Sequence, residues 1–279
     1  MTQKYAILGH PIGHSLSPHL QQAAFDEMQL DCSYQAIDTS PQLLPELLTE
    51  MRQGKWSGFN VTLPFKRRVL PLLDVLTPSA QSAGAVNTIY KKNNRLVGAN
   101  TDILAIEDIL NSQQLDPSNH CLLIGAGGAA RAALVVLINR GHPVTVLNRT
   151  ASNALFMTSE TNCNDRTDVA TFAHQNIPAL AKASQLLVNA TTIGMYGGPE
   201  PNRSPLPQEA FNSEHLVFDM VYSPEVTPML HYALKAGSRT IGGQNMLVGQ
   251  GAYSFKLWTG LEAPKLTMER AVREAIGLE

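Results

Sequence analysis

The sequence Cys121-Leu122-Leu123-Ile124-Gly125-Ala126-Gly127-Gly128-Ala129-Ala130-Arg131 joins an apolar run directly to a glycine-rich turn. Four consecutive apolar residues are typical of a parallel strand that is buried on both faces. A helix is expected from the turn to about Arg140, and residues 144–147 form the next apolar run. Strand, glycine turn, helix and strand at this spacing predict a doubly wound α/β unit.

The glycine spacing in this turn also predicts a ligand. Gly125 permits the tight turn, Gly127 lets the backbone approach a pyrophosphate, and Ala130 keeps helix and strand close. The first turn of the helix offers backbone N–H donors and a positive dipole end to phosphates. We therefore expect a dinucleotide site here in preference to a purely structural turn. Its predicted members are Gly125, Ala126, Gly127, Gly128 and Ala129.

The end of the following strand, Asn148-Arg149-Thr150, indicates which dinucleotide binds. An NAD site usually has an acidic residue there for the ribose 2′-hydroxyl, whereas an NADP site has an arginine. No acid is present, and the charge and planar donors of Arg149 suit a 2′-phosphate. The sequence favours NADP over the alternative that Arg149 is a solvated loop cation.

The remaining pattern predicts a second α/β unit on the N-terminal side. Strands are expected at 5–8, 33–37 and 58–61, with a hairpin of strands 86–90 and 96–99 around a polar turn at 91–95. Helices are expected at 18–28 with Ser17 as N-cap, at 41–53, and after Thr77-Pro78. Later helices are expected at 102–110, 244–258 and 266–276, and later strands at 186–189 and 216–218.

These elements predict two α/β domains. Residues 1–101 plus about 244–279 are expected to form a discontinuous, mixed-sheet substrate domain, because the C-terminal helices can pack back on the first unit. Residues 102–243 are expected to form a Rossmann-type dinucleotide-binding domain.

Composition narrows the class of protein. Of the 279 residues, 44% are hydrophobic and 16% charged, which is typical of a globular chain, and the net charge of −2 argues against nucleic acid or an anionic membrane as partner. Three separated cysteines without CxxC spacing favour a reducing compartment. With neither a signal-peptide pattern nor a transmembrane run, we expect a cytoplasmic protein.

Polar residues follow the ends of several predicted strands in the first domain, where ligands of open α/β sheets bind. The stretch from Gly58 to Lys66 ends an apolar strand in amide and hydroxyl groups and then presents a lysine. A lysine and an aspartate in one site can manage the proton when a ketone is reduced by hydride, and Asp102 is the candidate partner of Lys66. The alternatives are a helix-surface cation for Lys66 and a helix N-cap for Asp102.

Two other chemistries are disfavoured. His10, His14 and His19 lie close in sequence, but prolines and a glycine interrupt them and no Cys or carboxylate completes a metal set. No Gly-x-Ser-x-Gly pattern occurs, which disfavours a serine hydrolase.

Taken in order, these motifs resemble those of the shikimate dehydrogenase family. The resemblance covers the whole chain: residues 9–18 (GHPIGHSLSP), 60–66 (NVTLPFK), 83–88 (AGAVNT), 100–102 (NTD), 125–129, 148–150 (NRT), 189–195, 219–222 (DMVY) and 246–260. It implies an NADP-dependent oxidoreductase that reversibly reduces 3-dehydroshikimate to shikimate in chorismate and aromatic amino-acid biosynthesis. It also implies two domains flanking a cleft that closes to exclude water.

The resemblance assigns roles residue by residue. Lys66 and Asp102 match the catalytic pair, and Ser15 and Ser17 match serines that hold the substrate carboxylate. Ring hydroxyls are assigned to Thr62, Asn87 and Gln250, with Asn60 and Tyr222 nearby. Besides the glycine turn, the resemblance assigns seven residues to the cofactor: Asn148, Arg149, Thr150, Thr191, Met195, Val221 and Gly243.

The chain departs from the family pattern at two places. Ile103, Leu104 and Ala105 stand where the family usually has glycines after the aspartate, and Asn153 stands where a second cation often accompanies the arginine. The alternatives left open are a quinate/shikimate dehydrogenase with relaxed NAD/NADP use and a non-catalytic dinucleotide- or metabolite-binding protein on the same fold. The sequence leaves open whether the protein is a monomer or a homodimer.

Overall fold

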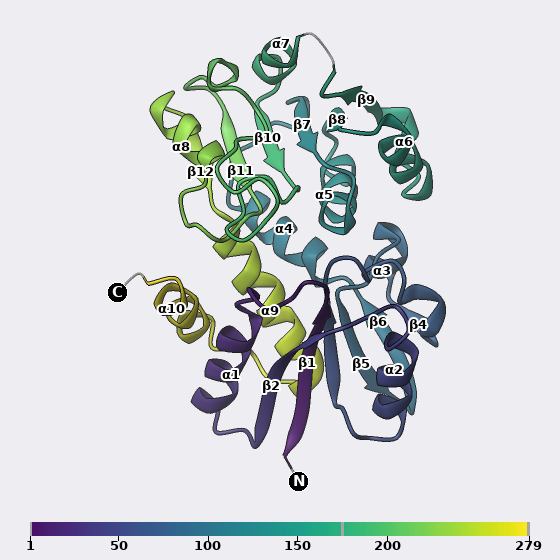
Figure 1. The fold of residues 1–279 in the computed structure, drawn as a ribbon. Helices are drawn as coiled ribbons and strands as arrows, with labels where there is room; N and C mark the ends of the chain where they lie inside the picture. Colours follow the sequence, from purple (N-terminus) through teal and green to yellow (C-terminus); the bar gives the residue numbers. More distant parts are fainter. Residues whose placement is uncertain (1, 174–175, 278–279) are drawn as a thin grey trace. The chain divides into compact units, whose positions relative to one another are not determined.

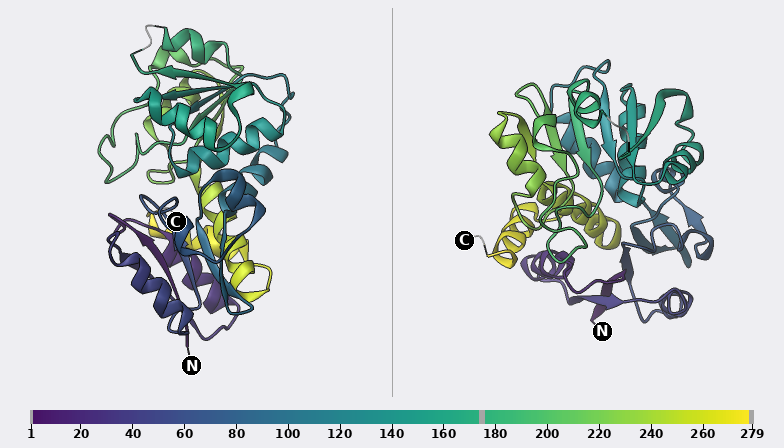
Figure 2. Two further views of the ribbon diagram at one scale, coloured as in Figure 1. Left: turned by 90° about the vertical axis from the view of Figure 1, so that its right-hand side faces the viewer. Right: turned by 45° about the horizontal axis from the view of Figure 1, so that its top comes forward.

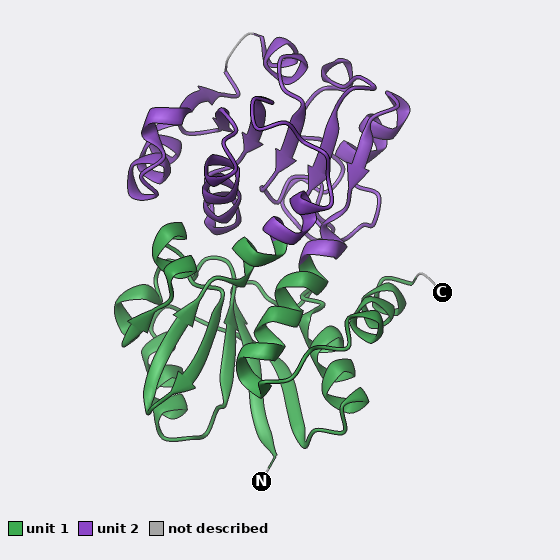
Figure 3. Cartoon of the chain, turned by 180° about the vertical axis from the view of Figure 1, so that it is seen from behind, with its two compact units in different colours: residues 1–105, 247–279 green, residues 106–246 purple. Residues whose placement is uncertain are grey.

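The computed structural model describes residues 2–173 and 176–277, which form two compact units (Figures 1 and 3). Unit 1 comprises Met1–Ala105 and Leu247–Glu279, and unit 2 comprises Ile106–Met246. The chain leaves unit 1 within α4 (Thr101–Asn111) and returns to it within α9 (Gly243–Thr259).

Unit 1 is built on a six-stranded mixed sheet of order β2-β1-β3-β5-β6-β4. The parallel pairs are β1·β2, β1·β3 and β4·β6, and the antiparallel pairs are β3·β5 and β5·β6. This confirms the predicted mixed α/β unit. The strands are β1 (Gln3–Gly9), β2 (Cys32–Asp38), β3 (Gly58–Val61), β4 (Val75–Leu76), β5 (Thr88–Lys92) and β6 (Arg95–Ala99).

Both faces of this sheet are covered by helices. Side chains alternate along β1, so neighbouring residues pack against different helices on the two faces. Ala6 and Leu8 lie in one core with residues of α2 (Leu44–Arg52), whereas Tyr5 packs against Phe25 of α1 (Ser17–Glu27) and Trp258 of α9. Helix α10 (Lys265–Ala275) packs on α1, so the C-terminal segment belongs to unit 1. The remaining helical segments are η1 (Leu70–Leu72) and α3 (Pro78–Ala83).

Two local expectations for unit 1 are corrected by its hydrogen bonds. Ser17 does not cap α1, because its own N–H donates to Ser15 Oγ at 3.3 Å and the helix already includes it. The hairpin turn is shorter than 91–95, since Lys92 still pairs with Arg95 and only Asn93 and Asn94 take the positive φ of a two-residue turn. The Thr77 cap is confirmed by its bond from Ala80 N.

Unit 2 is a six-stranded, fully parallel sheet of order β12-β11-β10-β7-β8-β9, which confirms the doubly wound prediction. Helices lie against both faces (Figure 2). Its strands are β7 (Cys121–Ile124), β8 (Val144–Asn148), β9 (Thr167–Thr171), β10 (Leu186–Asn189), β11 (Leu216–Asp219) and β12 (Arg239–Ile241). Its helical segments are α5 (Gly128–Asn139), α6 (Ala151–Glu160), η2 (Asn164–Arg166), α7 (Ile177–Lys182), η3 (Gln208–Ala210) and α8 (Pro228–Lys235).

Across residues 2–173 and 176–277, no helix has the length and apolar character needed to cross a bilayer.

Position 58 requires glycine because the side chain of Trp258 packs directly against its backbone. This contact provides a test of the packing in the unit 1 core. A Cβ at this position would lie 2.3 Å from Trp258 Nε1, and that indole donates to Ile89 O at 3.0 Å. We expect Gly58→Ala to lower the free energy of unfolding by roughly 2 kcal/mol in urea denaturation. Gly13→Ala is the control, because a Cβ there meets nothing within 4 Å. Equal stability of the two variants would contradict this packing.

Candidate active site

The ion pair between Lys66 and Asp102 is the centre of the candidate site in unit 1. Lys66 Nζ lies 2.5 Å from Asp102 Oδ2, and the two side chains are 15% and 3% exposed. A carboxylate this deeply buried is stable only if its oxygens are paired. The structure therefore brings together the two residues that the sequence predicted as a pair.

Backbone hydrogen bonds to the segments on either side of β3 hold the turn that carries Lys66. Thr62 N donates to Leu8 O at 2.9 Å, and Val86 N donates to Lys66 O at 2.7 Å. Phe65, directly before the lysine, is fully buried and anchors the turn in the core. The lysine is consequently held at the carboxyl ends of β1 and β3, next to the residues that precede β5.

Asn87 holds the other oxygen of Asp102. Its Nδ2 lies 2.8 Å from Asp102 Oδ1 and 3.4 Å from Gln250 Oε1, while its Oδ1 accepts the Thr101 N–H at 2.8 Å. Thr101 N can only donate, so this contact fixes which end of the amide faces the carboxylate. Contacts thus link four of the predicted residues in the order Lys66, Asp102, Asn87 and Gln250.

Asn60 is also at the site, but its amide bonds to the protein. Its Oδ1 accepts from the Tyr34 hydroxyl at 2.7 Å, and its Nδ2 lies within 3.1 Å of Asn87 O, Thr88 Oγ1 and Ser254 Oγ. The side chain is 4% exposed. Its hydrogen-bonding capacity is met inside unit 1, which suits a residue that positions its neighbours.

The predicted carboxylate-binding residues lie on the loop after β1. Ser15 and Ser17 flank the start of α1; Ser17 is buried and its hydroxyl contacts Tyr34. Burial raises the pKa of the Tyr34 hydroxyl well above its ordinary value, with the Ser17 hydrogen bond acting against this. Tyr34 therefore remains a neutral hydroxyl between Ser17 and Asn60.

Sequence reasoning missed Tyr34, Thr88 and Ser254, which complete the polar layer behind the pair. Tyr34 and Thr88 lie on strands that the sequence predicted, and Ser254 lies on a predicted helix. Tyr34 and Ser254 looked like ordinary members of their elements, whereas Thr88 belongs to the motif 83–88 but was given no role. Ile103, at the departure from the family pattern, is 5% exposed, and its N–H donates to Asn100 Oδ1 at 3.2 Å.

The predicted cofactor residues of unit 2 all lie at or after the carboxyl ends of its parallel strands. Ile124 at the end of β7 pairs in register with Leu147 of β8 and with Asn189 of β10, which aligns these ends along one edge. The cofactor residues lie at or after these ends and those of β11 and β12. Gly125 to Ala129 run from the turn after β7 into α5, and Asn148 ends β8 before Arg149 and Thr150. Thr191 and Met195 follow β10, Val221 follows β11, and Gly243 begins α9 after β12. Tyr222, predicted for the substrate, also belongs to unit 2.

The glycine turn has the geometry that a pyrophosphate requires. Gly125 takes a φ of +112°, and a Cβ there would lie 3.0 Å from Thr191 Cγ2. Gly127 is exposed, and a Cβ there would meet nothing within 4 Å, so its backbone is open to a ligand. Helix α5 begins at Gly128 without a side-chain cap, so its first backbone N–H groups can bind phosphate oxygens. Arg149 is exposed after β8, and Asn153 is exposed on α6. The residues present fit a dinucleotide.

Asp219 organises the loops after β10 and β11. Its Oδ1 accepts from Asn189 Nδ2 and Val221 N, and its Oδ2 accepts from Thr227 Oγ1 at 2.6 Å. Burial raises the pKa of Asp219 to about 6, and these three hydrogen bonds act in the opposite direction. The carboxyl thereby fixes the backbone of Val221, one of the predicted cofactor residues.

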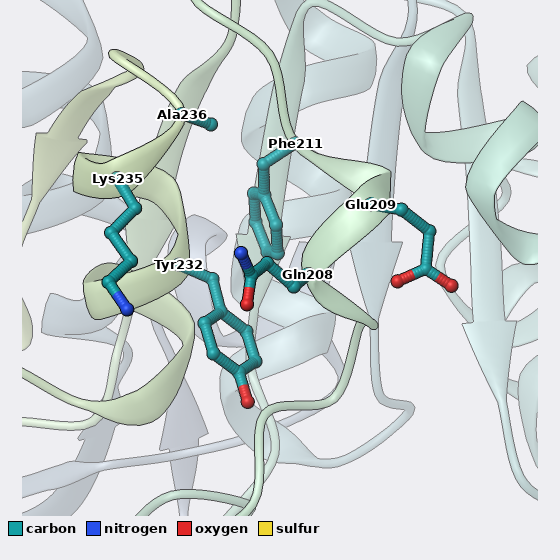
Figure 4. Close-up of a pocket in the computed structure, with 6 residues that line it drawn as sticks. All are labelled: Gln208, Glu209, Phe211, Tyr232, Lys235 and Ala236. Atoms are coloured by element: carbon teal, nitrogen blue, oxygen red, sulfur yellow. The ribbon is translucent and has the colours of Figure 1, made fainter.

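Two further features carry no predicted residue of the substrate or cofactor sets. An open pocket of about 440 Å³ on unit 2 is lined by Phe211 and Tyr232, with Lys235 of α8 and Glu209 of η3 beside them (Figure 4). On unit 1, His10 Nδ1 lies 2.7 Å from Asp38 Oδ1 at the surface. Within the described part of the chain, no three His, Cys, Asp or Glu residues cluster as metal ligands would.

The sequence matches two family models. Residues 7–89 match the shikimate dehydrogenase substrate-binding domain, and residues 243–273 match the shikimate 5′-dehydrogenase C-terminal domain. The chain is 39% identical over 276 residues to the NADP⁺ shikimate dehydrogenase of Thermus thermophilus, covering 99% of each protein. The chain belongs to the shikimate dehydrogenase family.

Solved structures of this family share the fold. The Thermus thermophilus shikimate 5-dehydrogenase, solved in complex with NADP(H) and shikimate, matches with a TM-score of 0.86 and 38% identity over 98% of this chain and 99% of that one. The quinate dehydrogenase of Corynebacterium glutamicum, solved with NAD, also has a TM-score of 0.86, at 28% identity over 98% and 99% of the two chains. The fold is thus shared by enzymes of two named substrates.

The raised pKa of Asp219 generates a pH prediction. Its folded value of about 6 lies above its ordinary 3.8, so the folded protein holds a proton that the unfolded chain releases between these pH values. The free energy of unfolding should therefore fall as pH rises through this range, by roughly 3 kcal/mol from this group.

Asp219→Asn tests this, since the amide can keep all three contacts if Thr227 accepts instead of donating. In urea denaturation followed from about pH 4 to about pH 7, the wild type should lose stability relative to the variant. Parallel curves for the two proteins would show that Asp219 does not titrate in this range.

Proposed function

We propose that this protein catalyses the reversible NADP-dependent reduction of 3-dehydroshikimate to shikimate, a step of chorismate and aromatic amino-acid biosynthesis. The observation that carries the proposal is the buried Lys66–Asp102 pair, with Nζ and Oδ2 2.5 Å apart. It occurs in a chain that shares 39% identity over nearly its full length with an NADP⁺ shikimate dehydrogenase. The enzyme is accordingly an oxidoreductase acting on a CH–OH group.

Lys66 transfers the proton of this reaction, and Asp102 holds the lysine in place. When bound, the nicotinamide of NADP supplies the hydride to the ketone carbon or accepts it from shikimate. The Lys66 ammonium then donates a proton to the developing alkoxide, and its amine accepts that proton in the reverse direction. Asp102 orients the ammonium and stabilises its charge, while Asn87 keeps the carboxylate from turning away.

The other unit 1 residues bind and orient the substrate in this proposal. Ser15 and Ser17 hold its carboxylate, and Thr62, Asn87 and Gln250 bind its ring hydroxyls. Asn60 acts mainly through Asn87, because its amide is occupied by protein partners. Tyr222 is proposed to contribute a hydroxyl from unit 2.

The cofactor is proposed to bind at the strand ends of unit 2. The backbone from Gly125 to Ala129 holds the pyrophosphate, and Asn148, Arg149 and Thr150 hold the adenosine ribose with its 2′-phosphate. Thr191, Met195, Val221 and Gly243 line the remaining strand ends. The residues proposed as the substrate domain are 1–101 plus about 244–279, and those proposed as the NADP domain are 102–243.

A quinate/shikimate dehydrogenase is the second candidate, favoured by the similarity to the Corynebacterium glutamicum quinate dehydrogenase and by Asn153 in place of a second cation. A non-catalytic binding protein is disfavoured, because such a protein has no need of a buried lysine–aspartate pair. All of the proposed groups belong to one chain, which suits a monomer or a homodimer. The cytoplasm is the proposed location.

Turnover and the lysine's role can be tested together. We expect the wild type to reduce NADP⁺ with shikimate faster than with quinate, measured by absorbance of the reduced nicotinamide. Lys66→Ala should lower kcat by roughly 100- to 10,000-fold, because the proton has no donor or acceptor, while the KM for NADP⁺ stays unchanged. Exposed Lys92→Ala is the control. Absence of wild-type turnover with either substrate would refute the function, and normal activity of Lys66→Ala would refute the lysine's role.

Cofactor preference depends on Arg149. Removing its guanidinium takes a charge-assisted contact from the 2′-phosphate that NAD⁺ lacks, so Arg149→Ala should raise the KM for NADP⁺ about tenfold and leave that for NAD⁺ nearly constant. The control is Arg239→Ala, an exposed arginine at the opposite, amino end of β12. Equal rises for both cofactors would argue that Arg149 does not hold the phosphate.

A further inference from the structure

A continuous chain of buried side-chain hydrogen bonds leads to the carboxylate of Asp102. The Tyr34 hydroxyl donates to Asn60 Oδ1 at 2.7 Å, and Asn60 Nδ2 lies 3.1 Å from Thr88 Oγ1. Thr88 Oγ1 donates to Asn87 Oδ1 at 3.0 Å, and Asn87 Nδ2 lies 2.8 Å from Asp102 Oδ1. Strands β2, β3 and β5 thus connect to the first turn of α4 through side chains alone.

The chain has one direction, set by groups that can play a single hydrogen-bonding role. The Thr101 N–H can only donate, which orients the Asn87 amide, and Asn87 O can only accept, which orients the Asn60 amide. The Asp102 carboxylate at the end accepts. Every donor therefore points toward the carboxylate, an arrangement in which successive hydrogen bonds strengthen one another.

Ser254 of α9 is the junction of this chain. Its oxygen lies 3.0 Å from Asn60 Nδ2, 2.8 Å from Thr88 Oγ1 and 2.9 Å from Gln250 O. Because the Thr88 hydrogen goes to Asn87 Oδ1, Ser254 accepts from Asn60 and donates its one hydrogen to Thr88, with Gln250 O as the alternative acceptor. Thr101 Oγ1 lies 3.3 Å from the same oxygen. The side chain is 0% exposed. One oxygen thus links the helix that carries Gln250 to the two residues that precede Asn87 in the chain.

We propose that Ser254 is a positioning residue of the reaction. Its hydroxyl accepts from Asn60 and donates to Thr88, so that the Asn87 amide keeps the Asp102 carboxylate beside Lys66. This role rests on the proposed function, because it is a role within that site. Ser254 touches neither member of the pair, so its effect reaches them through Asn87.

A matched hydroxyl on the same helix separates this role from simple helix packing. Serine and threonine hydroxyls in helices often bond to the carbonyl four residues earlier, and Thr259 does so with Phe255 O at 2.8 Å. Thr259 also accepts from Leu261 N at 3.1 Å, whereas Ser254 meets side chains of the site. Thr259→Ala therefore removes the helix contact without touching the chain to Asp102.

The test compares Ser254→Ala with Thr259→Ala in the full-length protein, assayed with shikimate and NADP⁺. For Ser254→Ala we expect kcat to fall about tenfold, with the KM for NADP⁺ unchanged. Shikimate deuterated at the carbon that loses hydride should give a larger isotope effect on kcat than in the wild type, because slower chemistry limits turnover more. Thr259→Ala should match the wild type in both readouts.

The outcomes separate this proposal from the function on which it rests. A wild type that turns over shikimate, with Ser254→Ala within twofold of it, would overturn the positioning role alone. So would a loss of kcat with an unchanged isotope effect and a lowered Tm, which would indicate a partly unfolded preparation. A wild type without turnover would overturn the proposed function and this role with it.

Tyr34→Phe provides a second measurement if Ser254→Ala folds poorly. It removes the donor at the far end of the chain and keeps the buried ring. We expect a smaller fall in kcat with the same rise in isotope effect. In the double variant the losses should be less than multiplicative, because both substitutions act through Asn60 and Asn87. Fully multiplicative losses would show that the two hydroxyls act independently and would overturn the chain as the route.

Discussion

The candidate site depends on the need of one buried carboxylate for partners. Asp102 is 2% exposed, and its two oxygens are taken by the Lys66 ammonium and the Asn87 amide. Removing either partner would leave a buried charge poorly compensated, at a cost of about 3–5 kcal/mol. This constraint holds together the turn after β3, the start of β5 and the start of α4. The same contacts place a lysine ammonium beside a fixed negative charge, and an ammonium so held can protonate the alkoxide formed in the proposed carbonyl reduction.

The polar side chains that hold Asn87 are subject to the same requirement for hydrogen-bond partners. A buried polar network is stable when every member is satisfied and costly when it is not. Here Asn60, Thr88 and Ser254 satisfy one another and hold Asn87. Unit 2 uses a comparable device at the ends of its parallel strands, where Asp219 gathers Asn189, Thr227 and the backbone of Val221. In both units, a carboxyl group away from solvent fixes the loops or turns that carry the proposed binding residues.

The elements that the sequence predicted best are those with a strong local pattern. The continuous apolar strands β7, β10 and β11 and the glycine turn before α5 were located correctly, because strands buried on both faces need such runs. The polar edge strand β9 (Thr167–Thr171) and the two-residue β4 were missed, since edges and short pairings need little hydrophobicity. The Ser17 cap was wrong because α1 already includes Ser17, and the helix has Leu16 as its N-cap residue with no side-chain cap hydrogen bond.

The sequence by itself determined the two-unit α/β architecture, the family, and the identities of the proposed catalytic and binding residues, because these leave ordered motifs and periodic patterns. The tertiary structure alone decided which atoms meet. It placed Asn87 on the second oxygen of Asp102, filled the amide of Asn60 with protein partners, and brought Ser254 to Asn60 across 194 residues of sequence. Hydrogen bonds between side chains so far apart in the chain leave no local pattern, because they depend on how packed strands and helices are brought together and not on any one segment.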